Sequence, residues 1–424
     1  MRILFTCYPE RTHFLLMAPM AWALRTAGHD VRIASQPKFT DVITQAGLTA
    51  VPVGSNRDLW QIVGRVKKTG SKLVPGLPEP YDAIERRPED ITLESLRAGY
   101  EVQIESWHKM TNVPLTAPLV EFARRWQPDL IIWEPLTFAG GIAAKATGAA
   151  HARLLIGADV YGVTRQHYVR LNAEQPEEHR TDPLADWLGS YARAYGGAFS
   201  EDMVTGQFSL DVLPPSLQIH APGLDYHSLR YTPYGGPAVV PKWLWEPPTR
   251  PRVALTLGLT VTDHGVGYPI GVQEILDAVA DLEIELVATI SDEARQTLER
   301  IPANARLVPY VPLQALLPTC SAVIHHAGVG TLTTAALYGV PQLALPWDVD
   351  QPVLSGRLAD HGAGLTTHST KATGSTVREN LLRLLEEQTF RDRARRLREE
   401  MLSVPHANAF VADLEKLVQE HHRQ

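Results

Sequence analysis

The sequence predicts an α/β protein built from two doubly wound, Rossmann-like domains, and three observations support this fold class. A strand–helix–strand pattern opens the chain, with a short apolar run at 2–7, helical spacing over 13–27 and a second strand at 30–34. Short apolar strands alternate with helices again after residue 252. The chain has 424 residues, which is more than one hydrophobic core usually supports.

The first domain is expected to span residues 1–230. Apolar residues of its first helix recur three or four positions apart, and Gly28 follows where a C-terminal cap is expected. Pro128 then separates a helix from DLIIW at 129–133, which has the pattern of a buried parallel strand. Residues 55–120 and 165–215 mix helical stretches with proline-rich turns, so their elements are not resolved by pattern.

A composition change marks the boundary to the second domain. Residues 231–251 contain six prolines and two adjacent glycines, which cannot form a regular element and therefore indicate a linker. The second domain is expected at 252–404, followed by a C-terminal helix at 405–424 that crosses back to the first domain. Its predicted strands are 253–258, 284–290, 305–311, 321–326 and 341–346, with helices at 272–282 and 292–301.

The composition excludes several classes of protein. The formal charge is -7 and no long basic run occurs, so nucleic acid is not an expected partner. The two cysteines, Cys7 and Cys320, are far apart, which argues against a disulfide framework or a cysteine-based zinc site. The N-terminus lacks the apolar core of a signal peptide, and no apolar run is long enough to span a membrane. We therefore expect a cytoplasmic protein.

A glycine-rich turn after the strand SAVIHH, 321–326, predicts an anion site. It contains Gly328 and Gly330 and leads into a helix that begins near Thr331. Glycine lets backbone N–H groups approach an anion closely, and the positive end of the helix dipole adds to the attraction. His326 can donate a hydrogen bond to a phosphate oxygen. A tight strand–helix turn without a ligand is the alternative that this segment alone leaves open.

A related turn, TLGLT at 256–260, closes the first strand of the second domain. Gly258 permits close approach of a ligand there, and Thr260 offers a hydroxyl group to phosphate. This short segment adds to the prediction of a phosphate site but does not establish one by itself.

Polar side chains also follow the strand PQLALP at 341–346. Asp350 and Gln351 come just after it, and ligands of doubly wound sheets bind beyond the carboxyl ends of the strands. A carboxylate beside an amide suits hydrogen bonding to neighbouring sugar hydroxyls. Asp348 and Asp350 could instead hold Mg²⁺ or Mn²⁺ on a diphosphate. The glycine turn and the helix start already offer neutralisation, so we expect no metal.

In the first domain, His13 is the candidate catalytic residue. It follows the first strand at the ligand-binding end of the sheet, and histidine can act as a general base because its pKa lies close to neutral pH. A helix cap or a surface residue is the alternative. The segment CYPERTHF contains no glycine, so the dinucleotide-binding fingerprint G-x-G-x-x-G is absent and a nicotinamide site is not expected.

Together these segments resemble a known family. HAGVGT and GVPQLALPWDVDQ are similar to the donor-binding signature of GT-B glycosyltransferases that modify natural products. THFLLMAPMAWALRTAGHDVRIAS, WEPLTFAGGIAA and RYTPYGGPAVVPKWL resemble an actinobacterial subgroup that attaches TDP-deoxysugars to macrolides and anthracyclines, such as the desosaminyl and mycaminosyl transferases. The resemblance covers essentially the whole chain. It implies two Rossmann-like domains facing across a cleft, with the acceptor on the N-terminal side and the donor on the C-terminal side.

The resemblance also implies roles for individual residues in antibiotic biosynthesis. His13 would deprotonate a hydroxyl of a polyketide aglycone in a single inverting displacement that needs no metal and no cofactor beyond the TDP-sugar. The donor residues fall into sets for the diphosphate, the sugar and the thymine: His326, Gly328, Gly330, Thr331, Thr260 and Gly258; Asp350 and Gln351; and the backbone around Val311. Many relatives carry an aspartate that orients the base, roughly a hundred residues after it. The corresponding region here offers Glu101, Glu105 and Asn112 without a clear match.

Relatives that transfer aminodeoxysugars often require an auxiliary protein related to cytochromes P450 but lacking haem, and the resemblance extends this expectation to the present chain. A candidate docking helix lies within 55–90, where an apolar cluster adjoins basic residues: Leu59, Trp60, Ile62 and Val63 beside Arg65, Lys67 and Lys68. A core-facing helix with a solvated basic edge is the alternative. A homo-oligomer is also left open.

Three other functions remain open at the level of the sequence. A nucleotide-sugar epimerase or a broad-range glucosyltransferase could use the same fold, and a non-catalytic nucleotide-sugar-binding protein could use the same donor site. A binding protein needs no base, so the presence of His13 together with Asp350 favours an enzyme.

Overall fold

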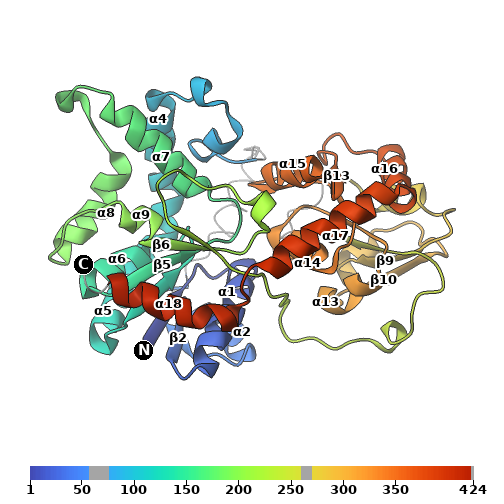
Figure 1. The fold of residues 1–424 in the computed structure, drawn as a ribbon, viewed down its shortest axis with the longest axis horizontal. Helices are drawn as coiled ribbons and strands as arrows, with labels where there is room; N and C mark the ends of the chain where they lie inside the picture. The colour runs from blue at the N-terminus through green and yellow to red at the C-terminus, as the bar shows by residue number, and fades with distance from the viewer. Residues whose placement is uncertain (57–75, 259–269, 422–424) are drawn as a thin grey trace. The chain divides into compact units, whose positions relative to one another are not determined.

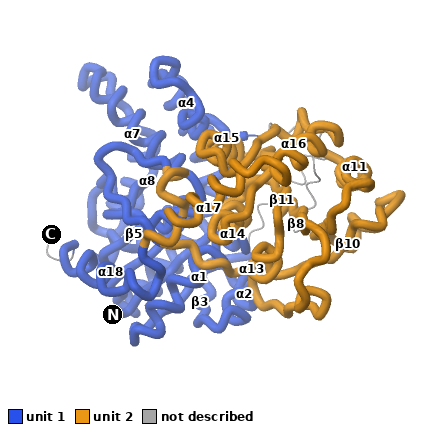
Figure 2. The backbone as a smooth tube through the Cα atoms, turned by 45° about the vertical axis from the view of Figure 1, so that its right-hand side comes forward, with its two compact units in different colours: residues 1–212, 219–229, 405–424 blue, residues 213–218, 230–404 orange. Residues whose placement is uncertain are grey.

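The computed structural model describes residues 1–56, 76–258 and 270–421 of the chain (Figure 1). These residues form two compact units, coloured separately in Figure 2: unit 1 with residues 1–212, 219–229 and 405–424, and unit 2 with residues 213–218 and 230–404. Each unit is built on one wholly parallel sheet. The predicted α/β class with two Rossmann-like units is therefore confirmed.

The sheet of unit 1 has seven strands in the order β3-β2-β1-β4-β5-β6-β7. The strands are β1 Arg2–Thr6, β2 Asp30–Ser35, β3 Ala50–Pro52, β4 Leu130–Trp133, β5 Ala150–Leu154, β6 Phe208–Asp211 and β7 Tyr226–Ser228. β1 pairs with β2 on one side and β4 on the other, so the strand order reverses between β1 and β4. All four residues of β4 are buried, as the unbroken apolar run predicted.

The helices of unit 1 are α1 Arg11–Thr26, α2 Thr40–Gln45, α4 Leu93–Gln103, α5 Lys109–Trp126, α6 Ala139–Thr147, α7 Val160–Ala173, α8 Pro183–Ala194, α9 Asp202–Thr205 and α18 Ala407–His421. A short π-helix, Ile104–His108, joins α4 to α5. The first helix begins two residues before the predicted position, so His13 lies in its first turn. Gly28 follows its end with a φ of 93°, a conformation that glycine adopts readily.

The C-terminal helix α18 is part of unit 1 and packs against α1. Beyond the end of α1, Nε2 of His29 lies 3.1 Å from Oε1 of Glu415 on α18. Residues 231–251, which the sequence indicated as a linker, belong to unit 2 and contain one 3-10 turn, Lys242–Leu244.

The sheet of unit 2 has six strands in the order β10-β9-β8-β11-β12-β13, which repeats the first six positions of unit 1. The strands are β8 Arg252–Thr256, β9 Glu285–Thr289, β10 Ala305–Val308, β11 Ala322–His325, β12 Gln342–Ala344 and β13 Gly364–Thr366. The strand predicted at 341–346 is shorter because Pro341 and Pro346 have no N–H group to donate to a neighbouring strand. Here too the order reverses, between β8 and β11.

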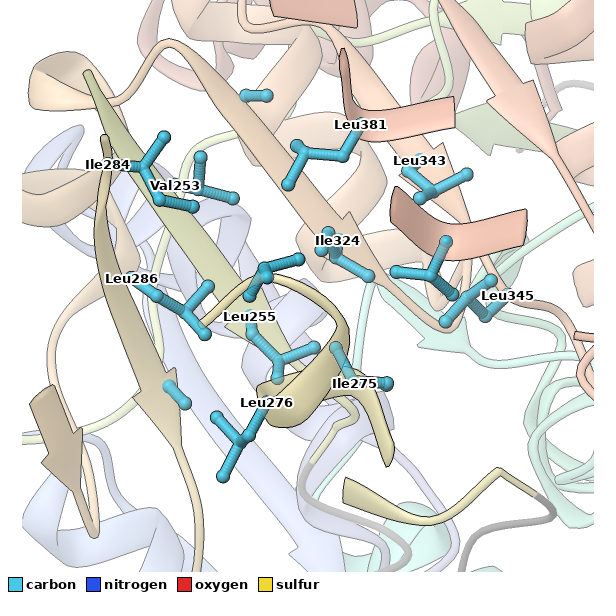
Figure 3. Close-up of a cluster of buried hydrophobic side chains, with 14 of the residues drawn as sticks. Val253, Leu255, Ile275, Leu276, Ile284, Leu286, Ile324, Leu343, Leu345 and Leu381 are labelled. Atoms are coloured by element: carbon cyan, nitrogen blue, oxygen red, sulfur yellow. The ribbon is translucent and has the colours of Figure 1, made fainter. Parts of the chain in front are cut away.

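The helices of unit 2 are α11 Val272–Ala278, α12 Asp292–Gln296, α13 Leu313–Leu316, α14 Val329–Tyr338, α15 Gln351–His361, α16 Gly374–Glu386 and α17 Gln388–Ser403. The prediction of a helix over 292–301 was too long. Oε1 of Gln273 accepts the N–H groups of Glu299 and Arg300 at 3.0 and 3.2 Å, so these residues are held outside a helix. The aliphatic side chains of β8, β9, β11 and β12 pack with those of α11 and α16 in a buried core (Figure 3).

Candidate functional site

The candidate site of unit 1 lies where the strand order of the sheet reverses. In doubly wound sheets this point leaves a crevice beyond the carboxyl ends of the two strands, because their connections run to opposite faces. The chain leaves β1 at Thr6 and places His13 in the first turn of α1, while Glu134 directly follows β4. Because β1 and β4 are neighbours in the sheet, these two side chains meet at the same edge.

His13 and Glu134 form a histidine–carboxylate pair. Nδ1 of His13 lies 3.8 Å from Oε2 of Glu134, and the imidazole is 17% exposed whereas the carboxylate is fully buried. Burial opposes ionisation of Glu134, but His13, the Thr137 hydroxyl and the Leu136 N–H more than offset it, so the pKa of this carboxyl lies below its ordinary value. A buried, ionised carboxylate next to an imidazole is an arrangement that orients and supports a general base.

Backbone and hydroxyl donors hold the Glu134 carboxylate in place. Its Oε2 accepts the N–H of Leu136 at 2.8 Å, and its Oε1 accepts the Thr137 hydroxyl and the N–H of Tyr8 at 3.2 Å. The Tyr8 N–H also lies 2.8 Å from Oγ1 of Thr137. The carboxylate is therefore held by hydrogen bonds from the loop that follows β4 and from the segment that follows β1.

Glu134 answers the question that the sequence left open about the partner of His13. Glu101 and Glu105 are both exposed, and Glu105 pairs with Lys109 four residues later. Asn112 is buried and has a different role, described below. The available signal was positional, because Glu134 is the first residue after an all-apolar strand. The number of residues from His13 was the wrong guide.

The candidate site of unit 2 occupies the equivalent position, between β8 and β11. The strand β11 ends at His325, whose side chain is fully buried and accepts the N–H of Ala327 at Nδ1, 3.0 Å away. His326 follows at the carboxyl edge of the sheet. Burial lowers the pKa of His325 to about 3, with His326 nearby acting in the same direction, so His325 is neutral and structural.

The His326 imidazole lies between two glycines. A Cβ atom built on Gly258 would come within 2.5 Å of its ring, and one on Gly328 within 2.3 Å. Both glycines are therefore required to accommodate the ring, in addition to the close approach that the sequence suggested. Burial lowers the pKa of His326 to about 4, despite a hydrogen bond with the backbone of Thr256 that acts in the opposite direction. The ring is therefore uncharged at neutral pH, and a neutral imidazole still carries one N–H donor.

The helix α14 starts at this edge with its N-terminal N–H groups uncapped by a side chain. Gly328 is its N-cap and Gly330 lies in its first turn, while Thr331 is largely buried with 8% of its surface exposed. Uncapped N–H groups at a helix N-terminus attract anions such as phosphate. A Cβ on Gly330 would contact the hydroxyl of Tyr231 at 3.4 Å, so a residue of the predicted linker packs on this turn.

Asp350 and Gln351 lie at the start of α15, with Asp350 as the N-cap residue. Oε1 of Gln351 accepts the N–H groups of Trp347 and Asp348 at 3.0 and 3.2 Å. The side-chain oxygen of Gln351 is thus engaged in the turn, so its amide NH₂ is the group that could serve a ligand. Val349 has a φ of 45°, which is uncommon for a β-branched residue and is a local strain at the edge of the site.

The other residues that the sequence predicted for a site are Val311, Thr260 and those of the candidate docking helix. Val311 is buried in a hydrophobic cluster of unit 2, and a contact of the backbone around it with thymine stays a prediction. Thr260 and the docking helix with Lys67 and Lys68 fall outside the described residues. Within the described ranges, no three His, Cys, Asp or Glu side chains gather as metal ligands, and no helix has the length and apolar character of a membrane span.

Two models of known families together match nearly the whole chain. The family model described as erythromycin biosynthesis protein CIII-like, N-terminal domain, matches residues 22–258, and the model of the corresponding C-terminal domain matches residues 273–417. Both units thus carry sequence features of one family. The relatives that match along their full length are named as transferases, which favours a transferase over the epimerase and the non-catalytic binding protein that the sequence had left open.

Individual relatives and solved structures agree with the family matches. The chain is 43% identical to 10-deoxymethynolide desosaminyltransferase of Streptomyces venezuelae, over 100% of this chain and 98% of the relative. It is 42% identical to the TDP-daunosamine transferase DnrS of Streptomyces peucetius, over 99% and 98%. The crystal structure of glycosyltransferase VinC in complex with DTDP is similar with a TM-score of 0.88 and 40% identity, over 99% of this chain and 100% of that one.

Proposed function

The chain belongs to the erythromycin biosynthesis protein CIII-like glycosyltransferases, and we propose that it transfers a deoxysugar from a TDP-sugar to a hydroxyl group of a polyketide aglycone. Its similarity to transferases named for 10-deoxymethynolide and for TDP-daunosamine, along their full length, supports this donor and acceptor class. The observation that carries the catalytic part of the proposal is the His13–Glu134 pair, because a protein that only binds nucleotide sugars needs no base.

In the proposed reaction, His13 removes the proton of the acceptor hydroxyl. Glu134 faces Nδ1, so Nε2 is the nitrogen that accepts this proton. The acceptor oxygen forms a bond to the anomeric carbon as the bond from that carbon to the diphosphate oxygen breaks. The electron pair of the broken bond leaves with TDP, and the configuration at the anomeric carbon is inverted.

The proposed leaving-group site is the start of α14. As the diphosphate departs, its charge grows, and uncapped N–H groups together with His326 can stabilise that charge. We assign the diphosphate to His326, Gly328, Gly330 and Thr331, with Gly258 and Thr260 beside it. These groups neutralise the phosphates without a divalent cation, so we propose that activity survives EDTA. A strict Mg²⁺ requirement would restore the alternative in which Asp348 and Asp350 bind a metal.

The sugar is assigned to Asp350 and Gln351. The Asp350 carboxylate can accept hydrogen bonds from sugar hydroxyls, and the NH₂ of Gln351 can donate one because its oxygen is engaged in the turn. The thymine is assigned to the backbone around Val311.

An auxiliary protein related to cytochromes P450 but lacking haem, docked on the segment with Lys67 and Lys68, also remains part of the proposal. We expect the isolated chain to turn over slowly, addition of such a protein to raise the rate, and charge reversal at both lysines to weaken the stimulation. Full activity of the isolated chain, unaffected by such a protein, would refute this part. The sequence also left a homo-oligomer open, and the oligomeric state is measured separately.

The proposed function is tested by incubating the purified chain with a panel of TDP-sugars and polyketide aglycones and detecting products by mass spectrometry. We expect a glycosylated aglycone and free TDP in equal amounts. His13→Ala should lower turnover by ~10²–10⁴, the usual contribution of a positioned base, with nearly unchanged TDP binding. Sugar isomerisation without an acceptor would indicate an epimerase instead, and activity of His13→Ala within threefold of the parent would remove His13 from the mechanism.

A further inference from the structure

Asn112 on α5 makes an unusual set of contacts for a buried side chain. It is 1% exposed, and both ends of its amide group are bonded to the loop that follows β4. Its Nδ2 donates to the carbonyl of Leu136 at 3.0 Å, and its Oδ1 accepts the N–H of Ala139 at 2.9 Å. Nδ2 also donates to the carbonyl of His108 at 3.0 Å, within the preceding helical turn. The amide therefore bridges α5 and the turn 136–139.

This bridge binds both ends of the turn 136–139, which holds the Glu134 carboxylate. Leu136 donates its N–H to Oε2 of Glu134 and its carbonyl accepts a hydrogen bond from Asn112, so both peptide groups that flank Leu136 are held. Ala139 is the first residue of α6, and the N-cap Phe138 has no side chain that could cap it. Asn112 supplies that cap from another helix. Thr137, between the two tied positions, donates its hydroxyl to Glu134.

We propose that Asn112 is a positioning residue for the reaction, because its amide holds the 136–139 turn so that the Glu134 carboxylate faces Nδ1 of His13. It touches neither reactant and acts only through Glu134. This inference rests on the proposed function for the reaction itself, but the arrangement that it describes lies entirely within unit 1. An asparagine is required because the two bonds need one donor and one acceptor, 2.9–3.0 Å from a carbonyl and an N–H group.

Two substitutions separate the two bonds. Asn112→Ala removes both, whereas Asn112→Asp keeps an acceptor for the Ala139 N–H but loses the donor to Leu136. Thr116→Val is the matched control: Thr116 is on the same helix, is 1% exposed, and its hydroxyl donates to the carbonyl of Asn112 at 2.8 Å. It tests whether loss of any buried polar bond in α5 has the same effect.

The first measurement is kinetic. We expect Asn112→Ala and Asn112→Asp to lower kcat on the order of 10- to 100-fold, as small misplacements of catalytic groups do, with little change in KM for the TDP-sugar. Thr116→Val should retain parental kcat. In the Glu134→Gln background, Asn112→Ala should cause little further loss, because the group that it positions is already gone. Full additivity of the two losses would show that Asn112 acts independently of Glu134 and would overturn the proposal.

The second measurement does not depend on turnover. NMR titration of the His13 imidazole, assigned with His13→Gln, reports how closely the carboxylate is held, since a nearby negative charge favours the protonated ring. We expect the His13 titration to move to lower pH in Glu134→Gln, and partly in the same direction in Asn112→Ala. Glu10 and Arg11, which adjoin His13 in the chain, are the same in all variants.

The two measurements distinguish failure of this inference from failure of the proposed function. A parental His13 titration in Asn112→Ala, in a protein whose NMR spectrum keeps the dispersed signals of a folded unit 1, would overturn the positioning role. Absence of turnover with every sugar and aglycone would instead contradict the proposed function. The shifted titration would then still support the arrangement of Asn112, Glu134 and His13.

Discussion

Replacing Glu134 by glutamine is the most direct test of the base in unit 1. The substitution keeps the size of the side chain but exchanges one carboxylate oxygen for an NH₂ group. Because Oε1 accepts from Tyr8 and Thr137, we expect the amide oxygen to take its place. The NH₂ group then occupies the position of Oε2, where it meets the N–H of Leu136 and the ring of His13.

The expected loss follows from the tautomer of His13. An NH₂ group opposite Nδ1 makes that nitrogen an acceptor, so the neutral ring carries its proton on Nε2 and cannot take a proton from the acceptor hydroxyl there. The same exchange in the Ser-His-Asp triad lowers kcat by about 10⁴. The separation of 3.8 Å is longer than a hydrogen bond, which weakens the coupling between the two groups. We therefore expect a loss on the order of 10²–10⁴ for Glu134→Gln.

The assay compares single-turnover rates of the parent and Glu134→Gln with one TDP-sugar and one aglycone, over a range of pH. The acidic limb of the profile should move to lower pH in the variant, because the charge that favours the protonated imidazole is absent. Glu105→Gln is the matched control, since Glu105 is exposed and pairs with Lys109 on the surface. Turnover of Glu134→Gln within threefold of the parent, with the same pH profile, would refute the role of Glu134.

Three further predictions concern the donor site and stability. Asp350→Ala should weaken binding of the TDP-sugar far more than binding of free TDP, whereas His326→Ala should weaken binding of both. Calorimetry that shows equal losses of affinity for the two ligands in Asp350→Ala would contradict this division. Gly328→Ala should displace the His326 ring and lower the affinity for TDP about tenfold or more. The control is Gly356→Ala, where a Cβ meets nothing within 4 Å, and it should bind TDP as the parent does. The lowered pKa of Glu134 stabilises the fold above the pKa of the unfolded carboxyl, and this contribution is lost as the pH falls through the folded pKa. Urea denaturation should therefore show the parent losing more stability than Glu134→Gln between neutral and acidic pH.

The fold was predictable because its signals are local. Buried parallel strands are continuous apolar runs, and the helices between them keep a period near 3.6, so both sheets could be located from the sequence. Element ends were less predictable because they depend on distant contacts. The end of α12, for example, is followed by two backbone N–H groups that bind Gln273, which lies on another helix.

The candidate site was only partly predictable. His13 and His326 could be found because each follows a strand that ends at the ligand-binding edge of a sheet. Glu134 was missed because α4, a π-helix and α5 intervene between β1 and β4, so the number of residues from His13 carries no information about distance in space. The roles of Gly258 and Gly328 around one imidazole also depend on two different strands, β8 and β11, and cannot be derived from either segment alone.

In the proposed reaction, the two units use the same position of the same strand order for different chemistry. In unit 1 the segment after β1 has no glycine and the strand β4 is followed by a buried carboxylate, which supports a base but would repel a diphosphate. In unit 2 the described residues that directly follow β8 and β11 carry no carboxylate, and the glycines there open the edge to backbone N–H groups and a neutral histidine. A base is supported by a nearby negative charge, whereas a diphosphate needs donors and no negative charge nearby. Because the two sites lie on different sheets, each can have the charge that its proposed role requires. Exchange of the two edge segments should therefore abolish both activities.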